Sequence, residues 1–264
     1  MSSRSEPAAE THWPSLGSPR VHRRRTGSTN ELARELAAAG APHGTLVTAS
    51  EQTAGRGRYG RKWWAPPGDS LLMSLVLREP RSLLPLASAI AVSDAVSETT
   101  GVESLIKWPN DIVLEEAGEN PPSRATAVAP ALGKLAGILI EGRPQEQWVV
   151  LGIGLNVAVS PRAIPAELRG IVATLGQLRA TIEPLLETLL HALERRLGEP
   201  EAQTLDSWRE RDALCGREIA WRTGDDVGVQ LRGRAEGIDG AGRLVVARPD
   251  GSRLTLEAGE VSLD

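Results

Sequence analysis

The stretch from Gln52 to Trp63 reads Gln-Thr-Ala-Gly-Arg-Gly-Arg-Tyr-Gly-Arg-Lys-Trp and connects two predicted strands, residues 45–49 and 71–77. It combines three glycines with four cationic side chains. Glycine lets backbone N–H groups approach a ligand closely, and arginine presents a planar fork of donors that suits phosphate. The loop therefore predicts a phosphorylated or adenylylated ligand. It matches neither a P-loop nor a dinucleotide fingerprint, and a solvated basic hairpin loop is the alternative.

The composition narrows the class of protein. The 264-residue sequence carries a formal net charge of -4, so overall charge does not favour nucleic acid as the main partner. Its one cysteine, Cys215, excludes an intramolecular disulfide and a cysteine-based metal site, and we expect this thiol to be buried. No stretch is long and apolar enough to span a membrane. These features predict a cytoplasmic protein without membrane or nucleic-acid partners.

Hydrophobic periodicity predicts a protein that contains both helices and strands. Residues 1–20 lack periodicity and are expected to form a disordered tail. Residues 21–214 form the main domain, with predicted helices at 28–40, 86–100, 182–197 and 204–213. A change of composition at 115–133 predicts a flexible surface insertion. In residues 215–264, short strands separated by Asp-Gly turns predict a small SH3-like β-barrel.

Four further motifs place polar groups at the ends of predicted elements. Residues 28–31, Ser-Thr-Asn-Glu, predict a capping box at a helix N-terminus, which also suits polar ligand groups. Residues 107–111, Lys-Trp-Pro-Asn-Asp, end a strand; turn chemistry would explain the last three residues but not Lys107. Lys134 opens an apolar strand, and glycines within residues 152–156, Gly-Ile-Gly-Leu-Asn, predict close approach of a ligand.

The sequence shows no recognisable nucleophile machinery. Its four histidines fall in no metal-ligand spacing, and no Gly-x-Ser-x-Gly elbow is present. Any chemistry must then depend on positioning and electrostatics.

The order of these motifs resembles that of biotin protein ligases, in the short form without an N-terminal DNA-binding domain. The resemblance covers about residues 26–197. It implies an α+β fold with a class II synthetase-like catalytic domain at 21–214, in which a mixed β-sheet is backed by helices. That domain would bind biotin and ATP, and the SH3-like barrel follows it. It also implies a ligase that forms a C–N bond in two steps. Biotin attacks the α-phosphate of ATP to give biotinoyl-5′-AMP and pyrophosphate, and a lysine of a carrier protein then displaces AMP.

The resemblance implies roles for individual positions. The implied biotin contacts are Ser28, Thr29, Asn30, Gln52, Arg56, Gly57, Arg58 and Lys134. The implied nucleotide contacts are Arg56, Arg58, Arg61, Trp63, Lys107, Asn110 and Asn156. The implied catalytic residues are Lys134, Lys107 and Arg58, and Asp111 is a candidate for Mg²⁺ or for the incoming lysine. The glycine–arginine loop would close as a mobile lid over the acyl-adenylate, and a segment within residues 157–175 would cover the adenine.

The implied substrates are biotin and ATP, with Mg²⁺. The implied partner is a biotin carboxyl carrier protein or domain of acetyl-CoA or other acyl-CoA carboxylases, with pyruvate carboxylase as a further candidate. The chain would be a monomer or a weak, ligand-dependent homodimer. Three alternatives stay open: a lipoate or octanoate ligase, a repressor that senses biotinoyl-AMP, and a non-catalytic binding module. The arginine-dense loop favours biotin, the repressor requires an N-terminal DNA-binding domain, and the binding module leaves Lys107 and Lys134 unexplained.

Overall fold

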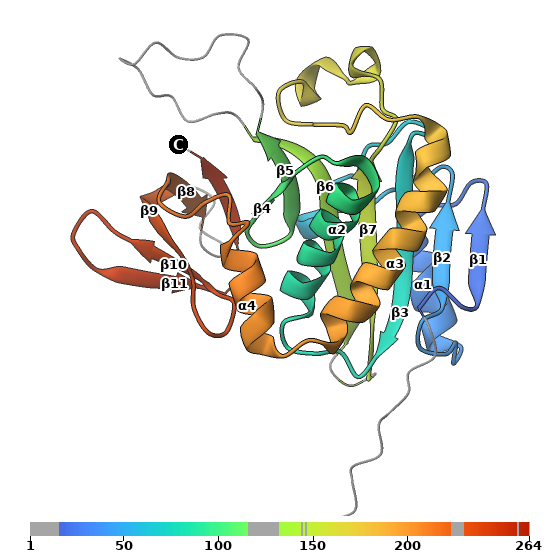
Figure 1. Ribbon diagram of the computed structural model, residues 1–264, viewed down its shortest axis with the longest axis horizontal. Coiled ribbons are helices and arrows are strands. Elements are labelled where there is room, and N and C mark those ends of the chain that lie inside the picture. Colours follow the sequence, from blue (N-terminus) through green and yellow to red (C-terminus); the bar gives the residue numbers. More distant parts are fainter. Residues whose placement is uncertain are drawn as a thin grey trace, which may run out of the picture.

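The computed structural model describes residues 16–115, 132–143, 145, 147–222, 230–257 and 259–263. A seven-stranded sheet lies at the centre (Figure 1), in the order β1 (Arg20–Arg23), β2 (Leu46–Ala49), β3 (Ser70–Arg78), β7 (Trp148–Asn156), β6 (Leu132–Arg143), β5 (Asp111–Glu115) and β4 (Leu105–Lys107). Neighbouring strands are antiparallel except β1 and β2, which are parallel. The predicted mixed sheet is confirmed.

Alternation along the strands gives the sheet two different faces, because successive side chains point to opposite sides. The odd-numbered residues from Leu71 to Leu77 belong to the main apolar core with α2 (Leu84–Thr100) and α3 (Ile182–Gly198). Figure 1 shows these two helices side by side across that face. On the other face, Val76 packs in a smaller apolar cluster with α1 (Thr29–Ala38). This smaller cluster covers only part of the second face, and the candidate functional site described below lies on the remaining part.

A second sheet follows α4 (Glu201–Arg209) and is antiparallel throughout. Its strand order is β11 (Arg253–Leu256), β10 (Leu244–Ala247), β9 (Gln230–Ile238), β8 (Glu218–Arg222) and β12 (Glu260–Leu263). The predicted C-terminal β unit is therefore present. Within the described residues, β11 and β12 are the two edges of this sheet, so the SH3-like barrel stays a prediction, as does a domain boundary at residue 215.

The two sheets are joined by direct contacts. Ile106 of β4 donates its N–H to the Arg211 carbonyl at 2.8 Å, and Ala213 donates to the Ile106 carbonyl at 3.0 Å. The connecting segment thus continues the edge of the main sheet. In addition, the Trp108 indole N–H donates to the Gly242 carbonyl of the second sheet at 3.1 Å. These bonds fix the C-terminal unit beside the end of β4.

The structure corrects several sequence predictions. Leu16 is buried and β1 begins at Arg20, so a disordered tail extending to residue 20 is wrong for residues 16–20, while residues 1–15 lie outside the described residues. β1 and β12 were not predicted, because each has only four residues, with charged residues among them. Cys215 is exposed rather than buried.

Two further predictions concern the capping box and the insertion. Ser28 holds the N-cap position of α1, but its side chain makes no capping hydrogen bond and lines the pocket described below instead. Most of the predicted insertion, residues 116–131, lies outside the described residues. No helix in the described part of the chain is long and apolar enough to cross a membrane.

Candidate active site

Glycines form the floor of the candidate site. On the sheet face that carries α1, Gly137 of β6 lies opposite Gly154 of β7. A Cβ atom on Gly154 would come within 2.6 Å of the Trp63 indole, and one on Gly137 within 3.0 Å. Side chains at these positions would therefore displace the indole. The close approach predicted from the strand glycines is made here by Trp63, which rests against the bare backbone of the two strands.

The glycine–arginine loop folds into a tight hairpin over this floor. Trp63 donates its N–H to the Gly55 carbonyl at 3.0 Å, and Gly57 donates to the Arg61 carbonyl at 2.7 Å. At the tip, Tyr59 has a φ of 54°, in the left-handed region. The hairpin therefore brings the four cationic side chains of this short loop to the candidate site. That the loop opens and closes as a lid stays a prediction.

Loop and floor enclose a cavity of about 160 Å³. Every predicted site residue except Asn156 lines it: Ser28, Thr29, Asn30, Gln52, Arg56, Gly57, Arg58, Arg61, Trp63, Lys107, Asn110, Asp111 and Lys134. Gly259 and Val261 of the C-terminal unit line it as well, a contribution that the sequence did not indicate. Residues separated by more than 200 positions are thus brought together in one pocket.

One end of the pocket, which we call the neutral end, is formed by Ser28, Thr29, Asn30 and Gln52. The Gln52 side-chain carbonyl accepts hydrogen bonds from the Thr29 backbone N–H at 2.7 Å and from its hydroxyl at 3.0 Å. Since this carbonyl is engaged on the protein side, the Gln52 amide nitrogen is the group that can donate to a ligand. The neutral end therefore offers uncharged, oriented hydrogen-bonding groups.

Ser74 supports the neutral end from beneath, and the sequence did not identify it. Its fully buried hydroxyl lies 2.6 Å from Asn30 Oδ1 and 2.8 Å from Thr29 Oγ1. Gly152 makes room for this arrangement, since a Cβ atom there would lie 2.0 Å from Asn30 Oδ1. A serine between Met73 and Leu75 of an apolar strand belongs to no motif. Only the strand register brings Ser74 and Gly152 together beneath α1.

Glu141 is a second residue that the sequence did not identify. Its carboxylate accepts a hydrogen bond from Asn30 Nδ2 at 2.9 Å and forms an ion pair with Arg56 at 3.1 Å. A longer pair with Arg34 of α1 spans 3.8 Å. Glu141 therefore connects the neutral end to the loop. The alternation from Gly137 through residue 139 to Glu141 is the signal that could have placed it on the site face.

The opposite end of the pocket, which we call the ionic end, is formed by Lys107, Asn110, Asp111 and Lys134. Lys134 Nζ lies 2.6 Å from Asp111 Oδ1 and 5.7 Å from the centre of the Trp63 ring. The Lys134 contact is an ion pair rather than an aligned hydrogen bond, because Asp111 Oδ1 has no hydrogen-bond partner among the described residues. Lys107 lies opposite Asp111 in the β4–β5 register. Two lysines with one carboxylate favour an anionic ligand.

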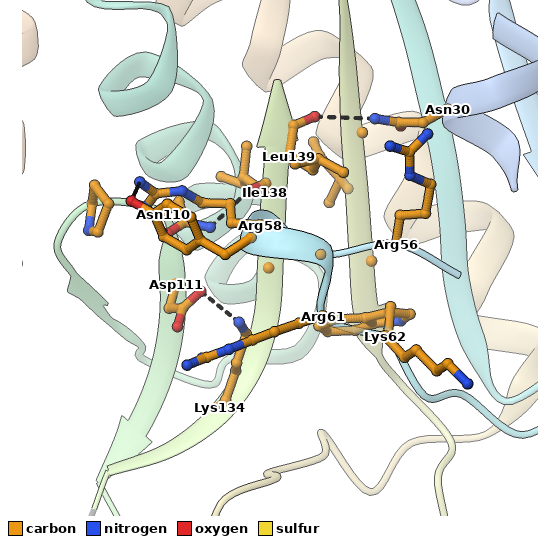
Figure 2. Close-up of a pocket in the computed structure, with 18 of the residues that line it drawn as sticks. Asn30, Arg56, Arg58, Arg61, Lys62, Asn110, Asp111, Lys134, Ile138 and Leu139 are labelled. Atoms are coloured by element: carbon orange, nitrogen blue, oxygen red, sulfur yellow. Dashed lines mark hydrogen bonds and ion pairs between the residues drawn. The ribbon is translucent and has the colours of Figure 1, made fainter. Parts of the chain in front are cut away.

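Asn110 ties the tip of the loop to the sheet. Its side-chain carbonyl accepts a hydrogen bond from Arg58 Nη1 at 3.0 Å, and its amide nitrogen donates to the Ile138 carbonyl at 2.7 Å. Figure 2 shows Arg58 beside Asn110 and Arg56 on the side of Asn30. The two arginines of the Arg-Gly-Arg sequence therefore serve opposite ends of the pocket.

Asp111 is the one predicted metal ligand. Within the described residues, no group of three or more His, Cys, Asp or Glu side chains could hold a metal ion. Mg²⁺ is usually bound through one or two carboxylates together with substrate phosphates. The single carboxylate of Asp111 at the ionic end suits this mode of Mg²⁺ binding, in which the phosphates of ATP would supply further ligands. A Mg²⁺ site at Asp111 stays a prediction.

Asn156 does not line the pocket, although the sequence placed it among the nucleotide contacts. It is buried, and its amide nitrogen donates to the Ala173 carbonyl at 3.1 Å. Leu175 in turn donates its N–H to the Asn156 carbonyl at 3.1 Å. Asn156 thus holds the segment 157–175 against the sheet. The same segment pairs with Lys134, which donates its N–H to the Ile171 carbonyl at 2.7 Å.

Comparison with known families agrees with this geometry. Residues 23–157 match the biotin/lipoate A/B protein ligase family, and residues 214–264 match the biotin protein ligase C-terminal domain. The chain belongs to the biotin/lipoate A/B protein ligase family. Both sheets of this ligase-family member are therefore accounted for by matches to ligase domains.

Individual relatives extend over nearly the whole chain. The chain is 34% identical over 255 residues to the biotin–[acetyl-CoA-carboxylase] ligase of Paracoccus denitrificans, covering 90% of this chain and 97% of that one. It is 31% identical to the bifunctional ligase/repressor BirA of Bacillus subtilis (strain 168), covering 92% of this chain and 74% of that one. Among solved structures, the biotin protein ligase from Aquifex aeolicus in complex with biotin and ATP aligns with a TM-score of 0.73 and 25% identity, over 94% of this chain and 99% of that one.

Proposed function

We propose that this chain is a biotin protein ligase, which forms biotinoyl-5′-AMP from biotin and ATP and then transfers the biotinoyl group to a lysine of a biotin carrier protein. The observation that carries the proposal is that one pocket has both the neutral end, with its hydrogen-bonding groups, and the ionic end, with its two lysines. An acyl-adenylate of biotin has the same two parts: an uncharged ring system and a negatively charged phosphate beside the reacting carbon.

The neutral end suits the ureido ring of biotin. That ring is uncharged and carries one carbonyl acceptor and two N–H donors. The Gln52 amide nitrogen and the Ser28 hydroxyl can donate to the carbonyl, and oxygens of Thr29 and Asn30 can accept from the N–H groups. Buried polar groups reject a ligand that leaves them unpaired. The dithiolane ring of lipoate has no such groups, which supports biotin as the substrate.

The cationic groups suit the first step. One oxygen of the biotin carboxylate attacks the α-phosphorus of ATP, and pyrophosphate leaves. Lys134 and Lys107 would offset the charge on the carboxylate and the α-phosphate, while Arg61 meets the outer phosphates. Each charge-assisted hydrogen bond of this kind contributes about 1.5–3 kcal/mol. Bound Mg²⁺ would supply further neutralisation of phosphate charge.

The loop has its own part in this step. Arg56, Gly57 and Arg58 would fold over the biotin carboxylate and the adenylate phosphate, and Trp63 and Asn110 would contact the nucleotide. A closed loop keeps water from the mixed anhydride, which otherwise hydrolyses. Asn156 acts indirectly, because it holds the segment that pairs with Lys134.

The second step needs no nucleophile from the enzyme. The carrier lysine attacks the acyl carbon, an amide forms, and AMP leaves with the electron pair of the broken bond. The attacking amine must lose a proton, and the Asp111 carboxylate, which lines the ionic end, would accept it. This reading agrees with the lack of a recognisable nucleophile motif in the sequence.

The first partner to test is the biotin carrier domain of acetyl-CoA carboxylase, because the Paracoccus relative is named for that enzyme. Carrier domains of other acyl-CoA carboxylases and of pyruvate carboxylase come next. We further propose a monomer that dimerises weakly, if at all, when ligand is bound. Sedimentation with and without biotin and ATP tests that part separately.

The decisive experiment is mass spectrometry of a purified carrier domain after incubation with this chain, biotin, ATP and Mg²⁺. We expect one biotinoyl group per carrier, lost when the acceptor lysine of the carrier is changed to arginine. A parallel reaction with lipoate in place of biotin should leave the carrier unmodified. Lipoylation without biotinylation would overturn the assignment to biotin, and an unmodified carrier in both reactions would overturn the proposed ligase activity.

A further inference from the structure

Lysine occurs in this chain only at the pocket. Of the 30 lysine and arginine residues, three are lysine and the other 27 (30 minus 3) are arginine. The three are Lys62, Lys107 and Lys134, and all of them line the cavity. Apart from the four histidines, every other basic side chain of the sequence is therefore a guanidinium.

This distribution matters for a protein that makes an acyl-adenylate. A mixed anhydride acylates amines, and a lysine amine is a nucleophile once it has lost its proton. A guanidinium keeps its proton at all relevant pH values and spreads its charge over three nitrogens, so it does not compete. Outside the pocket, a surface without lysine offers no side-chain amine to adenylate that escapes.

The pocket lysines differ in how firmly they are held. Lys134 Nζ is engaged by Asp111 at 2.6 Å and lies over the Trp63 ring. These contacts direct the Lys134 amine toward Asp111 and the Trp63 ring. Lys107 also interacts with a neighbouring group. Neither lysine is therefore well placed to attack the acyl carbon.

Lys62 is the exception. It is exposed, and it belongs to none of the ion pairs formed among the residues that the structure describes. It belongs to the glycine–arginine loop, next to Trp63, and Figure 2 shows its side chain pointing away from Lys134. A long side chain with four rotatable bonds at the edge of the cavity can reach adenylate in the pocket or as it leaves.

We propose that Lys62 is a self-modification site: in the absence of carrier, its amine is acylated by the chain's own biotinoyl-5′-AMP. This inference rests on the proposed function. The amine first gives its proton to water, and Nζ then attacks the acyl carbon. A C–N bond forms, the bond between the acyl carbon and the phosphate oxygen breaks, and AMP leaves with the electron pair. The resulting amide is neutral.

Acylation at this position would act back on the enzyme. The loop would lose one of its four positive charges, and a bulky group would be attached at the edge of the cavity. We therefore expect adenylate formation to fall as Lys62 becomes modified. A carrier domain competes for the same adenylate, so its presence should keep Lys62 free and the enzyme active.

The test is peptide mass spectrometry of the full chain after incubation with biotin, ATP and Mg²⁺, without carrier. We expect a biotinoyl group on Lys62, its loss in Lys62→Arg, and its suppression by added carrier domain. Arg24→Lys is the matched variant, because Arg24 is exposed and lies outside the pocket lining. The new lysine should become labelled, which would show that arginine elsewhere protects the surface.

ATP–pyrophosphate exchange, measured in the same samples, separates the two proposals. A chain without exchange would overturn the proposed function. A chain with normal exchange whose Lys62 stays unmodified, or whose label falls on Lys107, Lys134 or the amino terminus instead, would overturn the self-modification site and leave the proposed function standing. An unlabelled Arg24→Lys variant would overturn the protective role of arginine.

Discussion

The two ends of the pocket use different physical means to hold a ligand. At the neutral end, Ser28, Thr29 and Asn30 are 3–4% exposed, and Ser74 beneath them is fully buried. At the ionic end, the side chains of Lys134 and Asp111 are 32% and 23% exposed. The neutral end therefore offers buried, aligned hydrogen-bonding groups, whereas the ionic end offers charged groups that remain partly exposed to water.

Under the proposed function, the difference follows from what each end would recognise. A neutral ring can be distinguished only through polar groups that lose free energy if they stay unpaired, so those groups must be buried and fixed. A phosphate is attracted by any nearby cation and tolerates small changes of geometry. We therefore expect substitutions at the ionic end to affect chemistry more than biotin affinity, and substitutions at the neutral end to do the reverse.

Lys134→Ala should have the strongest effect on chemistry. It removes the cation that is ion-paired with Asp111 at the ionic end. Loss of one preorganised donor at a reacting centre costs about 10²–10³-fold in rate. We expect biotin-dependent ATP–pyrophosphate exchange to fall by that amount, while calorimetry shows only a small change in biotin affinity. Equal losses in both measurements would contradict the division between the two ends. Arg253→Ala, which removes an exposed ion pair on the second sheet, is the control.

Gly152→Ala should have the strongest effect on biotin affinity. The added Cβ atom would lie 2.0 Å from Asn30 Oδ1, so Asn30 must leave its bonds to Ser74 and Glu141. Leaving these buried polar groups unpaired makes the free energy of biotin binding less favourable by about 2–3 kcal/mol, which is roughly a 30–150-fold loss of affinity. Isothermal titration with biotin measures it. Gly198→Ala, with open space around the new methyl group, should bind biotin normally.

The sequence predicted the site better than it predicted the residues that support the site. Motifs that line the pocket, such as Arg56 to Arg58 and Lys134, combine charge and glycine in unusual order, so they stand out along the chain. Ser74 and the contact of Trp63 with Gly154 depend on which strands pair and in which register, and a single strand does not carry that information. Asn156 was assigned to the ligand because it belongs to a motif, yet its side chain bonds within the protein, to the Ala173 carbonyl and the Ser70 hydroxyl.

Ser74→Ala should lower biotin affinity less than Gly152→Ala does. It removes the hydroxyl that contacts both Thr29 and Asn30 but adds no clash. The expected loss is about 1–2 kcal/mol, or roughly 5–30-fold, with little change in the maximal rate of exchange. Ser88→Ala is the matched control, since Ser88 is equally buried but bonds within α2. Loss of affinity in both variants would point to general destabilisation rather than to the neutral end.

Glu141→Gln should have the smallest effect, and it tests whether the two ends are coupled. Glutamine keeps an oxygen that can accept from Asn30 Nδ2 but loses the charge that pairs with Arg56. A partly exposed ion pair contributes about 0.2–1 kcal/mol, so biotin affinity should change by less than about fivefold. Glu236→Gln, which weakens the ion pair with Arg253, is the control. If Glu141→Gln instead reduces exchange as strongly as Lys134→Ala does, Glu141 transmits biotin binding to the loop. The neutral and ionic ends would then work as one unit joined through Arg56.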